Sequence, residues 1–377
     1  MPLTAFSASR QMELDVDQLL QYLADIHQRG KLKPKEPIPD IWKQTIHSDL
    51  ECPACFVRGA EVVRASSSKV TGEAVKQAYF RFPGGHHPFC DFAILPTGEA
   101  PEGLVQFIST ARDGISRAIR DLVCKGIQIG VMDQVKIRGM REWFHHRKLS
   151  SQFHVSLDQQ VLQWVAAVQS GAWSVKYQPQ WLTVNQELLG IPGFDLRTAT
   201  EVMLARRHAS LLTYLLERAG MIRPLVSRIA KLASDHQGRS AFDPTSLKTE
   251  YDATLALAHF ISHHYEPVRR AIGRASYSAM KGSKPLMAFT ALLLFLSNWN
   301  LNQAAVLFAR IAGYKGYVDQ SLGNVMGLNP FHDYEAWSAL KVIQEIPVSE
   351  ITPYDLSHGM KEWIEETATA LRNGQTF

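Results

Sequence analysis

The sequence predicts a mainly α protein, with a helical body and a small β module near its N-terminus. Apolar residues recur at helical spacing from about residue 101 to the end, whereas residues 50–95 carry short β-branched and aromatic runs. Of the 377 residues, 46% are hydrophobic and 20% are charged, as in ordinary globular proteins. This length is enough for about two or three domains.

Residues 1–45 predict one helix and a linker. In "DVDQLLQYLADIHQRG" the apolar residues repeat at helical spacing, Asp15 can cap the start, and Gly30 can end the helix. The following "KLKPKEPIPD" has three prolines, which predict an extended linker.

Residues 46–98 predict a β-hairpin. The segments "AEVVRAS" and "AVKQAYFRF" carry β-branched or aromatic residues typical of strands. The polar stretch "SSSKVTGE" between them predicts the hairpin loop.

The rest of the chain predicts helices. Capping signals at Ser156, Thr198 and Thr352 mark three of the helix starts. A polar break, "SDHQGRSAFDPTS", predicts a division into helical domains 99–235 and 236–377. The predicted helices cover about residues 102–126, 156–171, 198–220 and 352–374.

Three of the four cysteines and two adjacent histidines lie within residues 52–90. Cys52 and Cys55 form a CPxC pair, and His87 and Cys90 form a second pair, with His86 as the alternative to His87. Two short pairs joined by a hairpin are the arrangement of a zinc ribbon, in which four protein ligands leave no open coordination position. The pattern predicts one structural zinc ion per chain.

Three other interpretations of this cluster stay open. The residues could be reduced side chains without a metal, a redox-active CxxC pair, or a catalytic zinc site with Glu51 or Asp91 as its base. The fourth cysteine, Cys124, lies on the apolar stripe of a predicted helix, where a thiol acts as a small apolar group.

The stretch from "CPAC" to "YFRFPGGHHPFC" resembles the N-terminal zinc ribbon of CoiA-like competence-protein families. In those families a CPxC is followed by a hairpin and by a short histidine-containing stretch after an aromatic strand. The resemblance covers about residues 50–95 and implies the zinc ligands named above. Such families often add a nuclease-like domain with a Glu-x-Lys element, which this chain lacks, because "EAVK" at Glu73 has a different spacing. The resemblance therefore implies the zinc ligands, and it does not extend to the nuclease activity.

A second candidate site lies in "EYDATLALAHFISHHYEP". His259, His263 and Glu266 are spaced i, i+4 and i+7, so they would share one helix face in a metal-dependent nuclease or hydrolase. The alternative is a pair of histidines favoured by the helix C-terminus before Pro267. The histidines of "REWFHHRKLSSQFH" predict a basic polar face.

The sequence contains no GxxxxGK[ST] loop, no GxGxxG after a strand, no GxSxG elbow and no HExxH. These absences argue against ATPases, dehydrogenases, serine hydrolases and thermolysin-like proteases. The sequence therefore favours a protein without enzymatic activity, and an enzyme of another class stays open.

Charge is distributed unevenly, with no Asp or Glu from residue 267 to residue 318. Such a span predicts contacts with a phosphate backbone. The alternative is a solvated basic surface that meets acidic helices elsewhere. The basic residues of the span are Arg269, Arg270, Arg274, Lys281, Lys284, Arg310 and Lys315.

The same region continues into "LNQAAVLFARIAGYKGYVDQSLGNVMGLNP". It predicts two helices around a tight turn at "GYKG", and Ala309 and Gly313 keep the small-residue spacing of a helix-turn-helix. Asp319 falls where an apolar residue is needed, so a generic helical hairpin is favoured.

Together these features predict a zinc-stabilised nucleic-acid-binding factor, with DNA favoured over RNA, of a prokaryotic regulatory, mobile-element or defence type. The alternatives are a protein-interaction module without nucleic acid and the metal-dependent enzyme described above. The N-terminus lacks a secretory signal pattern, and the most apolar run, residues 285–296, is shorter than the ~20 residues of a membrane span. We therefore expect a cytoplasmic protein without a membrane partner.

Overall fold

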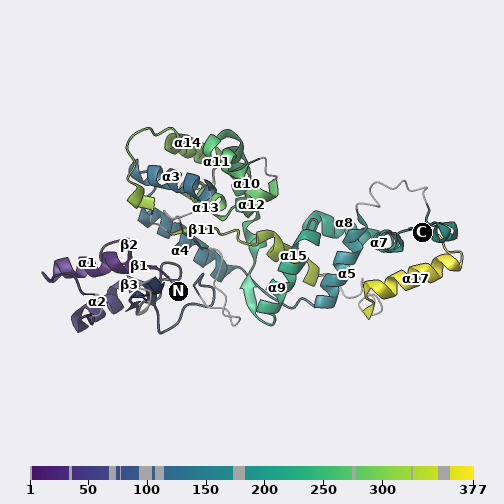
Figure 1. Cartoon of the computed structure of the whole chain (residues 1–377), viewed down its shortest axis with the longest axis horizontal. Helices are drawn as coiled ribbons and strands as arrows, with labels where there is room; N and C mark the ends of the chain where they lie inside the picture. The colour runs from purple at the N-terminus through teal and green to yellow at the C-terminus, as the bar shows by residue number, and fades with distance from the viewer. Residues whose placement is uncertain are drawn as a thin grey trace. The chain divides into compact units, whose positions relative to one another are not determined.

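The structure is a computed structural model of the whole chain (Figure 1), and it is mainly α-helical, as predicted. It consists of two compact units, each built from two separate parts of the chain. The first unit comprises Met1–Ser151 and Ser246–His332, and the second comprises Gln152–Thr245 and Asp333–Phe377. The structure describes residues 2–33, 36–67, 74–76, 78–92, 104–106, 114–172, 183–273, 277–323, 326–346 and 357–377.

This division differs from the predicted domains 99–235 and 236–377. The chain leaves the first unit after Ser151 and returns to it at Ser246, so the helices on either side of the excursion pack together. A composition change along the sequence marks where a chain crosses between units, but it does not reveal that the chain comes back.

A three-stranded antiparallel sheet opens the first unit, in the order β2-β1-β3. Its strands are β1 (Thr4–Ser7), β2 (Met12–Asp15) and β3 (Leu50–Glu51). Helix α1 (Val16–Ile26) follows β2, and the reciprocal capping box of Asp15 and Gln18 confirms its predicted start. Helix α2 (Asp40–Asp49) replaces the end of the predicted linker.

The predicted hairpin between residues 60 and 82 is confirmed as two antiparallel strand pairs. Strand β4 (Glu61–Val63) pairs with β7 (Tyr79–Arg81), and β5 (Ser66–Ser67) pairs with β6 (Ala74–Lys76). Its loop, residues 68–73, lies outside the described residues. Phe80 of β7 is buried with Trp42 of α2 and Leu23 of α1 in one core.

The helical part of the first unit is organised around α13 (Lys284–Leu296). Every residue from Leu286 to Leu294 is buried, and α13 packs against α3, α10 and α14. The other helices of this part are α3 (Gly114–Gln128), α4 (Gln134–Ser150), α10 (Lys248–His264), α11 (Glu266–Ile272), α12 (Tyr277–Gly282), α14 (Leu301–Ala312) and the 3-10 turn η4 (Gln320–Gly323).

The predicted helix 102–126 is wrong at its start. Leu104–Gln106 forms strand β8, which pairs with β11 (Met326–Leu328), and α3 begins only at Gly114. The partner strand lies more than 200 residues away in the sequence. Local periodicity carries no sign of such a distant partner, so it cannot predict this strand.

The second unit packs its helices around one core, which includes Leu162, Trp164, Leu204 and Ile343. Its elements are β9 (Gln152–His154), α5 (Gln159–Ser170), η1 (Gln186–Gly190), α7 (Leu196–Arg207), α8 (Ala209–Arg218), η2 (Arg223–Leu225), α9 (Val226–His236), β10 (Ser240–Phe242), α15 (Tyr334–Gln344) and α17 (Met360–Arg372); η3 (Pro244–Leu247) spans the passage back to the first unit.

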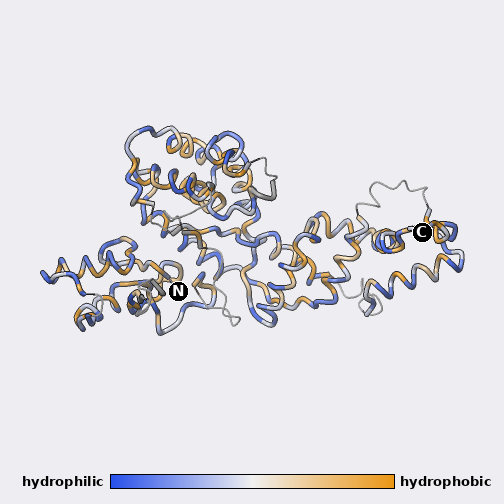
Figure 2. The backbone as a smooth tube through the Cα atoms, viewed as in Figure 1, coloured by the Kyte–Doolittle hydropathy of each residue, from blue (hydrophilic) through white to orange (hydrophobic). Residues whose placement is uncertain are grey.

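The predicted helix 198–220 breaks at His208, which ends α7 and precedes α8. The caps also differ from the prediction, because Asp158 and Asp195 cap α5 and α7 through their carboxylates. Figure 2 shows hydrophilic and hydrophobic residues alternating along the helices, as amphipathic helices around a core require.

No single helix in the described part of the chain is long and apolar enough to cross a membrane. Helices α13 and α14 reach that length and composition only when they are taken together across a bend of 114°.

Candidate metal centre and basic surface

The structure brings Cys52, Cys55, His86 and Cys90 into one cluster. Their four ligand atoms all lie within 4.8 Å of one another, and within the described residues they form the one such group that could hold a metal ion. The sulfurs of Cys52 and Cys90 are 3.8 Å apart, and Nδ1 of His86 lies 3.6 Å from the sulfur of Cys55 and 3.5 Å from that of Cys90.

Two tight turns at one end of the hairpin present these side chains. In the first turn the amide of Phe56 donates to the carbonyl of Cys52 over 3.0 Å, and Phe56 itself has a positive φ of 61°. In the second, the amide of Gly85 donates to the carbonyl of Phe82 over 2.9 Å. Gly85 has a φ of 82°, which favours glycine at this position. The pairing of β4 with β7 brings the two turns together.

His86 occupies the cluster in place of the preferred ligand His87, which corrects that preference. Nδ1 of His87 accepts a hydrogen bond from the amide of Phe89 over 3.2 Å, and its ring lies against His145 of α4 at 5.1 Å. Neighbouring histidines point in different directions, so only one of them can face the three sulfurs. The ring of Phe82 lies 5.3 Å from the ring of His86.

The three thiols affect one another's ionisation. Burial raises the pKa of Cys52 to about 12. Hydrogen bonding to Cys52 raises the pKa of Cys90 and lowers that of Cys55. A bound cation would stabilise all three thiolates, and thiolates are the form in which cysteine binds a metal.

A polar stripe on α4 holds the ribbon, which we define as residues 50–92. Arg138 donates to the carboxylate of Glu51, and Lys148 donates to that of Asp91 over 2.9 Å. Glu51 and Asp91 therefore serve as ion-pair partners, which argues against their use as the base of a catalytic metal. The guanidinium of Arg138 also lies over the ring of Phe6, 3.6 Å from its centroid.

The same stripe includes a fully buried ion pair. Arg141 of α4 pairs with Glu13 of β2, and the two side chains are 1% and 5% exposed. Burial lowers the pKa of Arg141 to about 9. Residues 138, 141, 145 and 148 follow one helix face, so the predicted basic face at "REWFHHRKLSSQFH" is turned inward at positions 141, 145 and 148.

The structure does not assemble His259, His263 and Glu266 into a metal-binding group. The two imidazoles stack at 4.0 Å, and Nδ1 of His263 lies 2.9 Å from the carbonyl oxygen of His259. The helix breaks after His264, and Glu266 begins α11, where its carboxylate accepts hydrogen bonds from Arg269 and Arg270. The spacing assumed one continuous helix, and that assumption is wrong.

The predicted basic residues differ in their surroundings. Arg269 and Arg270 are exposed and bind Glu266, and these ion pairs lower the pKa of the Glu266 carboxyl. Arg310 and Lys315 are exposed, and neither forms a hydrogen bond or ion pair with any described side chain. Lys281 is half-buried in α12, Lys284 is exposed at the start of α13, and Arg274 lies outside the described residues.

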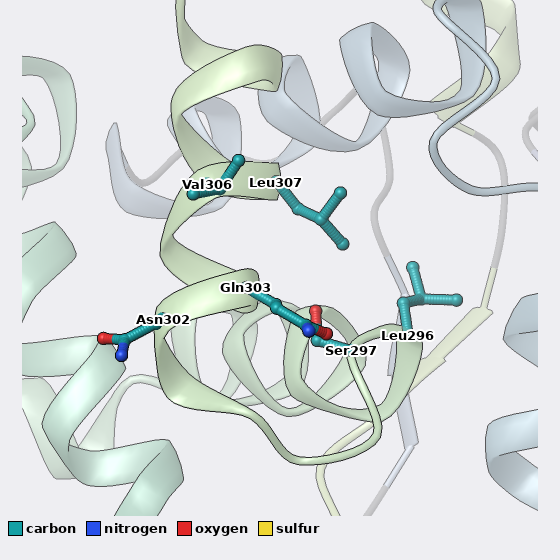
Figure 3. A pocket seen from close by; sticks show the side chains of 6 residues that line it. All are labelled: Leu296, Ser297, Asn302, Gln303, Val306 and Leu307. Atoms are coloured by element: carbon teal, nitrogen blue, oxygen red, sulfur yellow. The ribbon is translucent and has the colours of Figure 1, made fainter.

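Helices α13 and α14 form an elbow. They are bent by 114° across Ser297–Asn300, and in this turn Asn298 and Trp299 have positive φ angles of 49° and 62°. The amide of Trp299 donates to the carbonyl of Leu294 over 2.7 Å, which closes the end of α13. A hollow of about 420 Å³ lies at this elbow (Figure 3), lined by Leu296, Ser297, Asn302, Gln303, Val306 and Leu307.

The predicted helical hairpin around "GYKG" is not formed. Helix α14 ends at Ala312, and residues 313–323 contain only the 3-10 turn η4. Tyr317 is 84% exposed, and the hydroxyl of Tyr314 donates to its carbonyl over 3.2 Å. The two helices joined by a short turn are instead α13 and α14, one helix earlier in the chain.

Comparison with models of known protein families found no match, and comparisons with curated proteins and with solved structures found no significant similarity. The resemblance of residues 50–95 to CoiA-like ribbons therefore stays a prediction.

Proposed function

We propose that the cluster of Cys52, Cys55, His86 and Cys90 holds a structural zinc ion. A tetrahedral site with Zn–S bonds of about 2.3 Å and Zn–N bonds of about 2.0 Å has S–S edges of about 3.8 Å and S–N edges of about 3.5 Å. Three of the six distances between the ligand atoms are 3.8 Å, 3.6 Å and 3.5 Å, which supports zinc, and the other three are no longer than 4.8 Å. Three thiolates and one imidazole fill all four positions, so the site is structural.

The adjacent histidines offer a direct test of the ligand set. We expect His86→Ala to lower the zinc content well below one ion per chain, because it removes a ligand, and His87→Ala to leave the content unchanged. Elemental analysis of both purified variants checks this expectation. Zinc lost from His87→Ala and retained in His86→Ala would reverse the assignment.

We propose further that the whole chain binds duplex DNA through the helical part of the first unit. The observation that carries this proposal is the acid-free span 267–318, in which Arg310 and Lys315 lie exposed without described partners. On the neighbouring helix α3, the carboxylate of Asp121 pairs with Lys125 over 2.7 Å. A surface with uncompensated cations binds phosphates by displacing their counterions.

Duplex DNA fits this surface better than duplex RNA. Helix α14 presents its exposed side at the elbow, and the major groove of B-DNA is wide enough to admit a helix. The major groove of A-form RNA is deep and narrow and does not admit one.

The test is the affinity for mixed-sequence duplex DNA as a function of salt. We expect the affinity to fall by about tenfold or more between 50 mM and 200 mM salt, because each phosphate contact releases counterions. The variant Arg310→Glu/Lys315→Glu should bind more weakly and show a shallower salt slope. Fluorescence anisotropy with a labelled duplex measures both quantities.

A matched variant separates the local surface from net charge. Lys361 and Arg372 on α17 are also exposed, and Lys361→Glu/Arg372→Glu changes the net charge by the same amount. We expect this control to bind DNA nearly as well as the wild type. Equal weakening in both variants would mean that the contact surface is placed wrongly, and no binding by the wild type at 50 mM salt would refute DNA binding.

A further inference from the structure

We propose that α14 enters the major groove and that Asn302 and Gln303 contact base edges, favouring sites that contain adenine. This inference rests on the proposed DNA binding and adds to it the element that determines sequence preference. Four observations support it: the geometry of the elbow, the exposed face of α14, the rigidity of its attachment and the chemistry of its side chains.

The elbow has the geometry of a helix-turn-helix. In that motif two helices cross at about 90–120° and are joined by a turn of three or four residues, and the second helix lies in the major groove. Helices α13 and α14 are bent by 114° across Ser297–Asn300. Positive φ angles at Asn298 and Trp299 make the sharp turn that glycine often provides.

The outer face of α14 is free to make contacts. Asn302, Gln303, Val306 and Arg310 are exposed, whereas Ala304, Phe308 and Ile311 on the other side are buried. Neither carboxamide forms a hydrogen bond to a described residue, so the donors and acceptors of both are available. Figure 3 shows Gln303 and Leu307 pointing from α14 toward Ser297 and Leu296, while Asn302 points away from them.

Helix α14 is attached rigidly. The side chain of Asn300 accepts the amide of Gln303 over 3.0 Å and caps the helix. Trp299 in the turn packs on Trp143 at 5.0 Å, and Phe308 packs edge-on against Tyr265 of the α10–α11 junction at 5.6 Å. A helix fixed at both its start and its middle presents its outer side chains with little loss of conformational entropy on binding.

The side-chain chemistry fits base edges. The carboxamides of Asn and Gln pair with N6 and N7 of adenine, and apolar groups such as Val306 contact the methyl group of thymine. Arg310 lies on the exposed side of α14, eight positions after Asn302 or about 12 Å along the helix axis, and so beyond the bases that Asn302 and Gln303 would contact. Arg310 is therefore placed to reach a phosphate while Asn302 and Gln303 contact bases.

A protein partner is the competing occupant of this surface, because Leu301 and Val306 are 40% and 60% exposed. The composition around them favours DNA, since protein interfaces are depleted of charge at their centre. Here the apolar side chains alternate with two carboxamides and an arginine, and no acidic residue occurs between residues 267 and 318 to complement a basic partner.

The experiment is selection of bound sequences from a pool of random duplexes by the full-length zinc-loaded protein. We expect the wild type to enrich a motif containing adenine. In Asn302→Ala/Gln303→Ala, preference at one or two positions of that motif should fall by about tenfold, as expected for a lost bidentate contact. The affinity for mixed-sequence duplex should change less than about threefold, because phosphate contacts remain.

The control is Gln160→Ala/Asn373→Ala, which removes exposed amide side chains from the second unit. It should select the wild-type motif. If Asn302→Ala/Gln303→Ala selects that motif with undiminished preference, or the wild type binds duplex without any base preference, base contact by α14 is refuted while DNA binding stands. If the wild type binds no duplex at all, the proposed function itself fails.

Discussion

Replacing Cys52 with serine should abolish zinc binding and unfold the ribbon. Cys52 is fully buried, follows β3 directly and lies 3.8 Å from Cys90, so a hydroxyl there removes a thiolate from the centre of the core formed with Trp42 and Phe80. Structural zinc sites in small domains contribute on the order of 10 kcal/mol of apparent binding free energy, which is also folding free energy. The expected loss in the free energy of unfolding exceeds the loss caused by an ordinary core substitution, which is about 1–3 kcal/mol.

Three measurements check the result. The zinc content measured by elemental analysis should fall from about one ion per chain to none, because a structural site needs all four of its ligands. Limited proteolysis should cut within the ribbon, residues 50–92, and the thermal midpoint of unfolding should fall. Chelation of zinc from the wild type should reproduce these effects.

Cys124→Ala is the matched control, because Cys124 is equally buried but lies in α3, outside the cluster. The variant should keep its zinc, and its free energy of unfolding should fall by about 1 kcal/mol, because the substitution leaves a small cavity. A Cys52→Ser protein that keeps zinc and resists protease like the wild type would refute the structural site. Zinc loss without any effect on folding would show that the ribbon does not depend on the ion.

The local part of this structure could be predicted from the sequence. The cap at Asp15, the amphipathic pattern of α1 and each of the two ligand pairs are short patterns whose own residues lie close together in the chain, where spacing has a direct geometric meaning. The choice between His86 and His87 could not be predicted, because both lie close enough to Cys90 in the sequence to form a ligand pair with it. It depends on how the turn at Gly85 orients each ring.

The docking of the ribbon on α4 could not be predicted, because α4 is buried on two sides. Ile137, Met140 and Phe144 form a buried apolar stripe, while Arg141 and Lys148 are buried on the polar side. Periodicity analysis assigns a polar stripe to solvent. The polar stripe of α4 faces protein because its acidic partners, Glu13, Glu51 and Asp91, come from three distant segments of the chain. The spacing of residues within α4 cannot reveal those partners.

The basic surface was predictable in composition but not in location. The absence of acids from residue 267 to residue 318 is visible in the sequence. The pairing of Arg269 and Arg270 with Glu266 is not, because it depends on where α11 begins. A helical hairpin was expected around Gly313, but the sharp turn between two helices lies at Asn298 and Trp299, and sequence rules that look for glycine overlook it.

The buried pair of Glu13 and Arg141 gives the second large expected effect. Arg141→Met leaves the carboxylate of Glu13 buried between β2 and α4 without its countercharge, and such a charge costs about 3–5 kcal/mol. Glu13→Gln should cost a similar amount, because it leaves a fully buried guanidinium whose pKa burial already lowers to about 9. Urea unfolding followed by tryptophan fluorescence measures both losses.

The double variant Glu13→Gln/Arg141→Met tests the cause, because it removes both charges together. It should lose less than the sum of the single losses, since neither partner is left as an unpaired charge. The exposed pair of Glu61 and Arg81 is the control: both side chains are about half exposed, and Arg81→Met should cost less than about 1 kcal/mol. Additive losses at Glu13 and Arg141 would mean that the two side chains stabilise the fold by separate packing. A less than additive loss identifies this ion pair as a coupled contact that fixes α4 against the N-terminal sheet, beside the ribbon that the zinc ion holds.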